Sequence, residues 1–167
     1  MRAKSSSLRH PLHPTSDCDT RKSGIEIGIA SPPAILMGMK IKTFNPPGAP
    51  PVVGPYSHVV CAGGFCFCSG QIPLDPKTGD VVAGGIDAQT TRVMENIGTI
   101  LNSVGLGFSQ VVKTTIYLVD LQEFAIVNNI YSTYFTSHLP ARSTVQVAAL
   151  PKGVRIEIEV SAMFADL

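Results

Sequence analysis

Apolar and polar residues alternate with two different periods along most of the chain, and these periods predict its elements. The period of two, with β-branched and aromatic residues, predicts strands at residues 41–44, 57–61, 65–69 and 111–118. Apolar residues that recur every three and four positions predict helices at residues 87–104 and 121–138. The residues expected to face the core are Val93, Ile97, Ile100, Leu101 and Val104 in the first helix, and Phe124, Val127, Tyr131 and Phe135 in the second. This order predicts one sheet with both helices on one face, so its other face has no predicted cover.

Two more strands are predicted near the C-terminus, on either side of a Pro-Lys-Gly turn at residues 151–153. In the first, Arg142, Thr144 and Gln146 point to one side, because successive side chains of a strand alternate. In the second, Glu157 and Glu159 oppose a row of Ile and Val. We expect a polar face of the sheet that carries the guanidinium and both carboxylates. A solvated face with ion pairs across the strands is the alternative.

Arg142 and Glu157 are the candidate catalytic residues. Arg142 follows a Pro-Ala step, which stiffens the entry to the strand and holds the guanidinium near one position. A rigid guanidinium fork suits a carboxylate ligand, which it binds through two parallel hydrogen bonds. A nearby carboxylate such as Glu157 could then act as a general acid or base on the bound molecule.

Composition limits the possible classes of protein. The chain has 167 residues, 44% hydrophobic and 15% charged, which favours one compact domain with part of its surface buried against another subunit. A net charge of +1 without a basic stripe argues against a nucleic-acid partner. No apolar run is long enough to cross a membrane. The cysteine spacings do not match a metal site, and we expect no metal.

Four cysteines are present, of which Cys61, Cys66 and Cys68 fall in one predicted hairpin. We expect reduced, intracellular cysteines that pack as small hydrophobic residues. A Cys61–Cys66 bridge across the Gly63-Gly64 turn is the geometric alternative.

Residues 1–38 lack any sustained period and carry five Lys or Arg and three Asp or Glu. They predict a disordered tail or a non-native N-terminal extension that begins upstream of the usual start, with Met37 or Met39 as alternative starts. The three acidic residues argue against a transit peptide, so we expect a cytoplasmic protein, with an organelle as the alternative.

Several motifs in register carry a family resemblance. PARSTVQVAALPKGVRIEIE at residues 140–159 resembles the C-terminal signature of the RidA (YjgF) family of imine and enamine deaminases. Further matches stand upstream in the expected order: GPYS at 54–57, SGQIP at 69–73, DPKTG at 75–79, VKTT at 112–115 and FAIVNNIY at 124–131. The resemblance covers residues 39–167, which it defines as one RidA-like domain.

The resemblance implies an α+β fold, namely a chorismate-mutase-like mixed β-sheet with two helices packed on one face, trimer-forming, with ligand clefts between subunits. It implies a cofactor-free deaminase that hydrolyses reactive 2-imino acids and their enamine tautomers to 2-oxo acids and ammonia. Arg142 would anchor the substrate carboxylate, and Glu157 would handle the attacking water. A non-catalytic small-carboxylate binder is the alternative function, and a ribonuclease or translation inhibitor is a further one.

The remaining candidate binding residues each have a structural alternative. Tyr56 would line the cleft from a neighbouring subunit, or be a half-buried aromatic residue with a wet hydroxyl. Ser69 and Gly70 would offer backbone N–H groups to a ligand, or form a plain turn. Asn128 lies in a predicted helix, where a packing role and a ligand role are equally open.

Two positions depart from the family pattern. Thr144 stands where many members carry cysteine, so thiol chemistry is lost there while its backbone N–H remains to contact ligand. His58 stands where glutamine is common, and we expect an exposed surface histidine, although one near the cleft could alter ligand preference.

Overall fold

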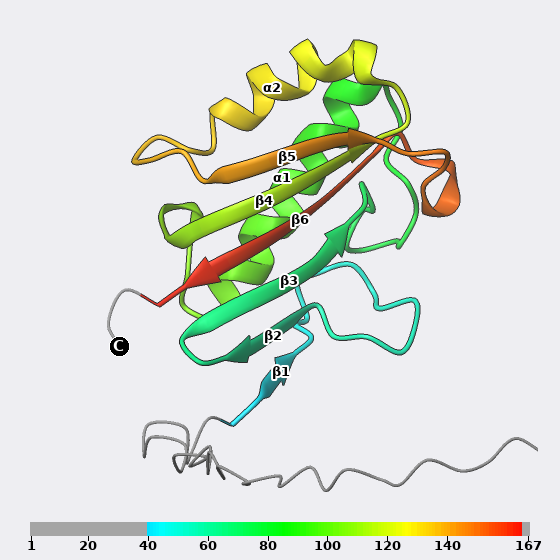
Figure 1. Ribbon diagram of the computed structural model, residues 1–167. Coiled ribbons are helices and arrows are strands. Elements are labelled where there is room, and N and C mark those ends of the chain that lie inside the picture. The colour runs from blue at the N-terminus through cyan, green and yellow to red at the C-terminus, as the bar shows by residue number, and fades with distance from the viewer. Residues whose placement is uncertain (1–39, 165–167) are drawn as a thin grey trace, which may run out of the picture.

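A computed structural model describes residues 40–164, which form one six-stranded mixed sheet with two α-helices (Figure 1). The strands are β1 (Lys42–Phe44), β2 (Val59–Ala62), β3 (Phe65–Gln71), β4 (Val111–Leu118), β5 (Ala141–Gln146) and β6 (Ile156–Met163). The helices are α1 (Ile86–Ser103) and α2 (Phe124–Ser132). The predicted α+β class is confirmed. The predictions made for residues 1–38 lie outside the described residues.

The strand order of the sheet is β1-β2-β3-β6-β4-β5. Every neighbouring pair is antiparallel except β4 and β5, which are parallel. A parallel pair needs a crossover connection, which α2 provides here. The C-terminal strand β6 therefore lies in the middle of the sheet, between β3 and β4 (Figure 1).

Helix α1 crosses behind the sheet and covers one of its faces (Figure 1). Its buried side chains include Val93, Ile97, Ile100 and Leu101, which recur at three and four residues and pack against the inward residues of β3, β4 and β6. Beyond its C-terminus Gly105 takes a φ of 76°, a left-handed conformation that glycine adopts without steric cost. The predicted helix and its stop signal are both confirmed, to within a residue or so at each end.

Helix α2 is shorter than predicted, since it ends at Ser132 and not at residue 138. The Ser132 and Thr133 hydroxyls donate to the carbonyls of Asn129 and Ile130, at 2.8 and 2.7 Å. These side chains satisfy carbonyls that a further helical turn would have used. Phe135 is nevertheless buried in the core, as predicted, from the turn that follows.

The predicted polar face that joins Arg142 to Glu157 is wrong. Strand β4 lies between β5 and β6, and the register aligns Arg142 with Thr114, and Glu157 with Tyr117. Thr114 and Tyr117 are three residues apart in β4, so they point to opposite faces of the sheet. Arg142 therefore shares the helix-covered face, whereas Glu157 and Glu159 lie on the uncovered face.

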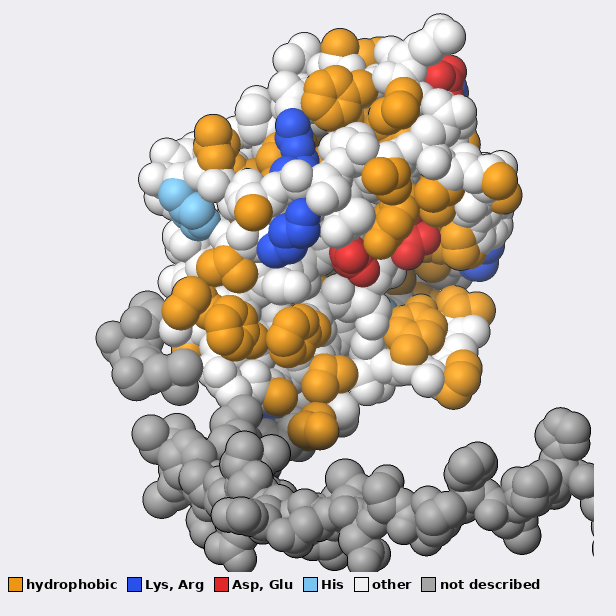
Figure 2. Space-filling view, in the orientation of Figure 1, with side chains coloured by type: hydrophobic (Ala, Val, Ile, Leu, Met, Phe, Trp, Pro, Cys, Tyr) orange, Lys and Arg blue, Asp and Glu red, His pale blue; other side chains and the backbone are white. Residues whose placement is uncertain are grey.

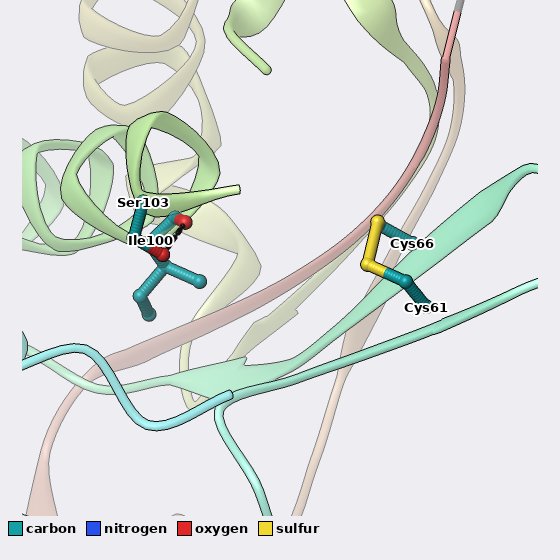
Figure 3. Close-up of a disulfide and its surroundings, with 4 residues drawn as sticks. All are labelled: Cys61, Cys66, Ile100 and Ser103. Atoms are coloured by element: carbon teal, nitrogen blue, oxygen red, sulfur yellow. Dashed lines mark hydrogen bonds between the residues drawn. A yellow bond between two sulfur atoms is a disulfide. The ribbon is translucent and has the colours of Figure 1, made fainter. Parts of the chain in front are cut away.

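Cys61 and Cys66 form a disulfide across the β2–β3 hairpin, so the expectation of reduced cysteines is wrong for this pair (Figure 3). The two residues are direct partners in the antiparallel register, and their Cα atoms lie 4.1 Å apart. Both side chains point to the same buried face. Cys68 is free and buried, and burial raises the pKa of its thiol to about 12.

The disulfide closes a loop of six residues, which predicts a stabilisation of roughly 2 kcal/mol from the lost entropy of the unfolded chain. A reductant should therefore lower the melting temperature. The Cys61→Ser variant should show the lowered value with or without reductant, whereas Cys68→Ser should keep the reductant-dependent difference. If a strong dithiol reductant did not lower the melting temperature of the wild type, this result would contradict a disulfide in the folded protein.

Candidate active site

Four of the predicted site residues line one pocket on the uncovered side of the sheet. Tyr56, Ser69, Gly70 and Glu157 share a cavity of about 400 Å³. Glu157 projects from β6, while Ser69 and Gly70 lie near the end of β3, where its register with β6 shifts. Figure 2 shows two neighbouring acidic side chains on this face, beside a hollow with hydrophobic side chains on its far side.

The Glu157 carboxylate lies directly against the backbone of Gly70. A Cβ atom built on Gly70 would stand 1.9 Å from Oε1 of Glu157 and 2.8 Å from its Cδ. Any side chain at position 70 would thus compete with the carboxylate for the same space. Gly70 thus leaves room for the Glu157 carboxylate. This role is separate from the predicted contact between the Gly70 backbone and a ligand.

Ser69 is held by the neighbouring strand. Its backbone N–H donates to the carbonyl of His58 at 2.9 Å, and its Oγ donates to the carbonyl of Ser57 at 2.7 Å. Both donors are therefore engaged, and the side chain of Gln71 in turn donates to the Ser69 carbonyl at 3.1 Å. Within this chain, the contacts of Ser69 therefore fit the structural role that was the alternative to ligand binding.

Burial raises the pKa of Glu157, and the negative charge of Glu159 raises it further. Glu159 lies two residues along β6 on the same face, and the Tyr117 hydroxyl donates to its Oε1 at 3.2 Å. A carboxyl group with a raised pKa exchanges a proton more readily near neutral pH than an exposed glutamate does. This property suits a general acid or base.

Arg142, Asn128 and Thr144 form a second group, around the edge strand β5 and helix α2. The Arg142 guanidinium lies over the rings of Tyr131 and Phe124, 4.8 and 5.4 Å from the ring centres. Arg142 and Asn128 line a separate cavity of about 290 Å³. Among the described residues, no carboxylate lies within ion-pair distance of Arg142, so the guanidinium keeps its hydrogen-bond donors for a ligand.

Thr144 lies two residues beyond Arg142 on the same face of β5. Its Oγ1 is buried and has no hydrogen-bond partner in the part of the chain that the structure describes. The two groups of site residues do not meet within one chain, because they belong to opposite faces of the sheet.

Three residues that matter to the site were missed or misjudged from the sequence. His58 is buried, with an exposed fraction of 3%, so the prediction of a surface histidine is wrong. Its ring lies under the proline-rich segment and donates from Nε2 to the Pro50 carbonyl at 2.8 Å. Tyr131 and Phe124 were expected only as core residues, and their rings also pack against the Arg142 guanidinium. Their spacing along the helix indicated that both side chains point inward. The spacing does not show which side chain of β5 lies against them, because that depends on how β5 pairs with β4.

Two negative findings apply to residues 40–164. They contain no group of three or more His, Cys, Asp or Glu side chains placed to hold a metal ion. None of their helices combines the length and the apolar character needed to cross a membrane.

The six-stranded mixed sheet with two helices on one face defines a class of fold that many solved structures share. In this chain the other face carries the pocket with Glu157. A family model described as Endoribonuclease L-PSP matches residues 47–164. The chain thus belongs to the RidA (YjgF) family.

Relatives match almost their whole length. Protein DfrA of Myxococcus xanthus is 50% identical over 75% of this chain and 97% of its own. The human 2-iminobutanoate/2-iminopropanoate deaminase is 47% identical over 79% of this chain and 94% of its own. Escherichia coli TdcF, solved with bound serine, has a TM-score of 0.71 and 38% identity, and the match covers 74% of this chain and 99% of TdcF.

The raised pKa of Glu157 predicts a pH-dependent stability. Folding disfavours the ionised form of this carboxyl group, so it destabilises the fold when the pH is well above the reference value of 4.5. The penalty disappears as the pH falls and the carboxyl becomes protonated. Glu157→Gln should therefore melt at a higher temperature than the wild type near pH 8, and the difference should shrink toward about pH 4.

Thermal melts over this pH range test the sign of the shift. Glu123→Gln is a matched control, because it removes a carboxylate that is paired with Arg155 away from the pocket. The control should not gain stability near pH 8. A Glu157→Gln variant that is less stable than the wild type near pH 8 would contradict the raised pKa.

Proposed function

We propose that this protein hydrolyses reactive 2-imino acids, and their enamine tautomers after protonation at carbon, to 2-oxo acids and ammonia. The observation that carries the proposal is the Glu157 carboxyl, which has a raised pKa and is held against Gly70 in a pocket large enough for a small molecule. Relatives at 43–47% identity bear the name 2-iminobutanoate/2-iminopropanoate deaminase, which supports this reaction.

We infer that a complete site takes residues from two copies of the chain. One copy supplies Glu157, Gly70 and Tyr56, and a neighbouring copy supplies Arg142, Asn128 and Thr144. The split of these residues between two faces supports this arrangement, as does the exposure of Arg142 at the edge of the sheet. Members of the family bind small ligands and are commonly trimeric. A trimer with three such clefts would also cover apolar residues of the open face, among them the stacked Phe65 and Phe67.

The reaction follows from these groups. The substrate carboxylate binds the Arg142 fork, which fixes the C=N carbon near Glu157. Glu157 takes a proton from water as the water oxygen bonds to the carbon of the protonated imine, which gives a neutral carbinolamine. Glu157 then returns that proton to the nitrogen and the C–N bond breaks. Ammonia leaves as the hydroxyl oxygen forms the C=O bond of the 2-oxo acid and passes its own proton to Glu157. An imine hydrolyses readily, so positioning and one acid–base group suffice.

A pure binding protein and a ribonuclease remain the alternatives. The description of the family model favours the second, since it names an endoribonuclease. The chain has a net charge of only +1, whereas RNA affinity rests mainly on Lys and Arg contacts to phosphates. The deaminase proposal needs no such surface. A binding protein would need Arg142 but not the ionisable group of Glu157.

Substitutions at Arg142 and Glu157 should separate binding from catalysis. Arg142→Ala should weaken the binding of 2-oxobutanoate by at least about tenfold, because a charge-assisted, two-pronged interaction is lost. Arg142→Lys should restore binding only in part, since a single ammonium cannot reproduce the fork. Glu157→Gln should bind 2-oxobutanoate within a few-fold of the wild type, yet slow 2-iminobutanoate decay by about a hundredfold or more.

Calorimetric titration with 2-oxobutanoate measures the binding. A coupled assay, in which threonine dehydratase generates 2-iminobutanoate, measures its decay. Glu159→Gln is the matched control for Glu157→Gln, because it makes the same change two residues away and should retain most of the rate. Normal turnover in Glu157→Gln, with binding still impaired in Arg142→Ala, would favour a binding protein.

Mixing these two impaired variants, at a substrate concentration at which each alone has little activity, tests whether the site is shared between copies. Arg142→Ala and Glu157→Gln protomers, unfolded together and refolded at equal amounts, should regain about a quarter of wild-type activity. Half of the copies supply an intact Glu157, half supply an intact Arg142, and a site needs one of each from two different copies of a symmetric ring. If both residues acted within one chain, every site in the mixture would stay defective and no activity would return.

A further inference from the structure

Arg142 is held in place without an acidic partner. The ion pairs that the structure records within its described residues join other side chains. An arginine that is paired with a carboxylate donates its N–H groups to it, so a second carboxylate must compete for the same donors. A guanidinium that binds a carboxylate ligand is therefore better oriented by groups that accept no hydrogen bond from it.

Two aromatic rings of α2 provide such groups, and we call Phe124 and Tyr131 the aromatic shelf. The Cζ atom of Arg142 lies 5.4 Å from the ring centre of Phe124 and 4.8 Å from that of Tyr131, within the range of cation–π attraction. The two residues stand two turns apart on α2, so they share one side of the helix. A ring face attracts the positive charge but takes up no N–H group as a carboxylate would.

The ring of Tyr131 is itself fixed at both ends. Its hydroxyl and Oγ1 of Thr114 form a buried hydrogen bond of 2.9 Å, and its ring packs against Phe135 with 4.5 Å between the ring centres. Thr114 is fully buried and is the register partner of Arg142 in the neighbouring strand. Strand β4 thus ties the ring of Tyr131 to the backbone position of Arg142. The ring cannot move away from the guanidinium without breaking a buried hydrogen bond.

The shelf matters because Arg142 is an exposed side chain on an edge strand, with many rotamers open to it. Restricting these rotamers before a ligand arrives lowers the entropy cost of binding. We propose that Tyr131 and Phe124 are positioning residues, which orient the Arg142 guanidinium for the substrate carboxylate in place of an acidic partner. The proposal rests on the role of Arg142 in the function proposed above.

Substitutions at Tyr131 separate the ring from its hydroxyl. Tyr131→Leu removes the ring face but keeps an apolar side chain, and it should weaken the binding of 2-oxobutanoate about fivefold, as expected for the loss of a cation–π contact. Tyr131→Phe keeps the ring and should bind within about twofold of the wild type. It leaves the Thr114 hydroxyl without its partner in the core, so it should lower the melting temperature while the affinity is retained.

Tyr134→Leu is the matched control for Tyr131→Leu. It makes the same change three residues further along, at a half-buried tyrosine whose ring packs on Phe108 with 5.2 Å between the ring centres. Its affinity for 2-oxobutanoate should equal that of the wild type.

A double-mutant cycle tests whether the shelf acts through Arg142. In the Arg142→Ala background, Tyr131→Leu should weaken binding by less than about twofold, because the group that the ring positions is already absent. A merely structural role would give the same factor in both backgrounds. Should Tyr131→Leu not fold, Phe124→Leu takes its place in the cycle, since Phe124 is only half-buried and contacts the same guanidinium.

Calorimetric titration with 2-oxobutanoate measures each affinity, and thermal melts show that each variant is folded. A loss of affinity that depends on Arg142, with normal affinity in Tyr131→Phe and Tyr134→Leu, supports the proposal. An equal loss in the Arg142→Ala background, or no loss when the ring is removed, overturns it and leaves the hydrolase function standing. A wild type that shows this pattern of binding but does not speed 2-iminobutanoate decay overturns the hydrolase function and leaves the shelf standing. A wild type that does neither overturns both.

Discussion

The position of β4 in the sheet determines how the functional residues of this protein are arranged. Because β4 lies between β5 and β6, the last two strands never pair with each other, although only residues 147–155 separate them in sequence. Its register places Arg142 against α2 and Glu157 on the uncovered face. A hairpin of the last two strands would have allowed both charges to meet in one chain. The observed order separates them, and this separation is why we propose a site that draws on a second copy.

The sequence was most informative where periodicity and local chemistry agree. The strand at residues 111–118, the hairpin around Gly63-Gly64 and the helix that stops before Gly105 all follow from side-chain period and turn residues. Ser69 and Gly70 were chosen at the end of a predicted strand, Glu157 from the strand pattern and the family resemblance, and Tyr56 mainly from that resemblance. The structure brings all four together in one pocket. Such features depend on neighbours along the chain or on a strongly constrained motif.

Two of the errors, those at Arg142 and His58, come from the pairing of segments that are distant in sequence, and two others are local. The side-chain period of β5 gave the correct alternation for Arg142 and Thr144, but it cannot say which of the two faces is covered. The disulfide depends on the register that places Cys61 opposite Cys66, and composition alone favoured reduced thiols. The burial of His58 depends on a proline-rich segment that has no period of its own. In α2, hydroxyl groups ended the helix before its apolar pattern ended.

The contact between Gly70 and Glu157 links two positions that are 87 residues apart in the chain. A methyl group at position 70 and a glutamate carboxylate at position 157 would require the same volume. The two positions can therefore vary only together. A larger residue at 70 calls for a shorter acid at 157, such as aspartate, which would set the carboxylate one methylene further from any bound molecule. Among related sequences, a glycine at the first position and a glutamate at the second should thus be retained or lost as a pair.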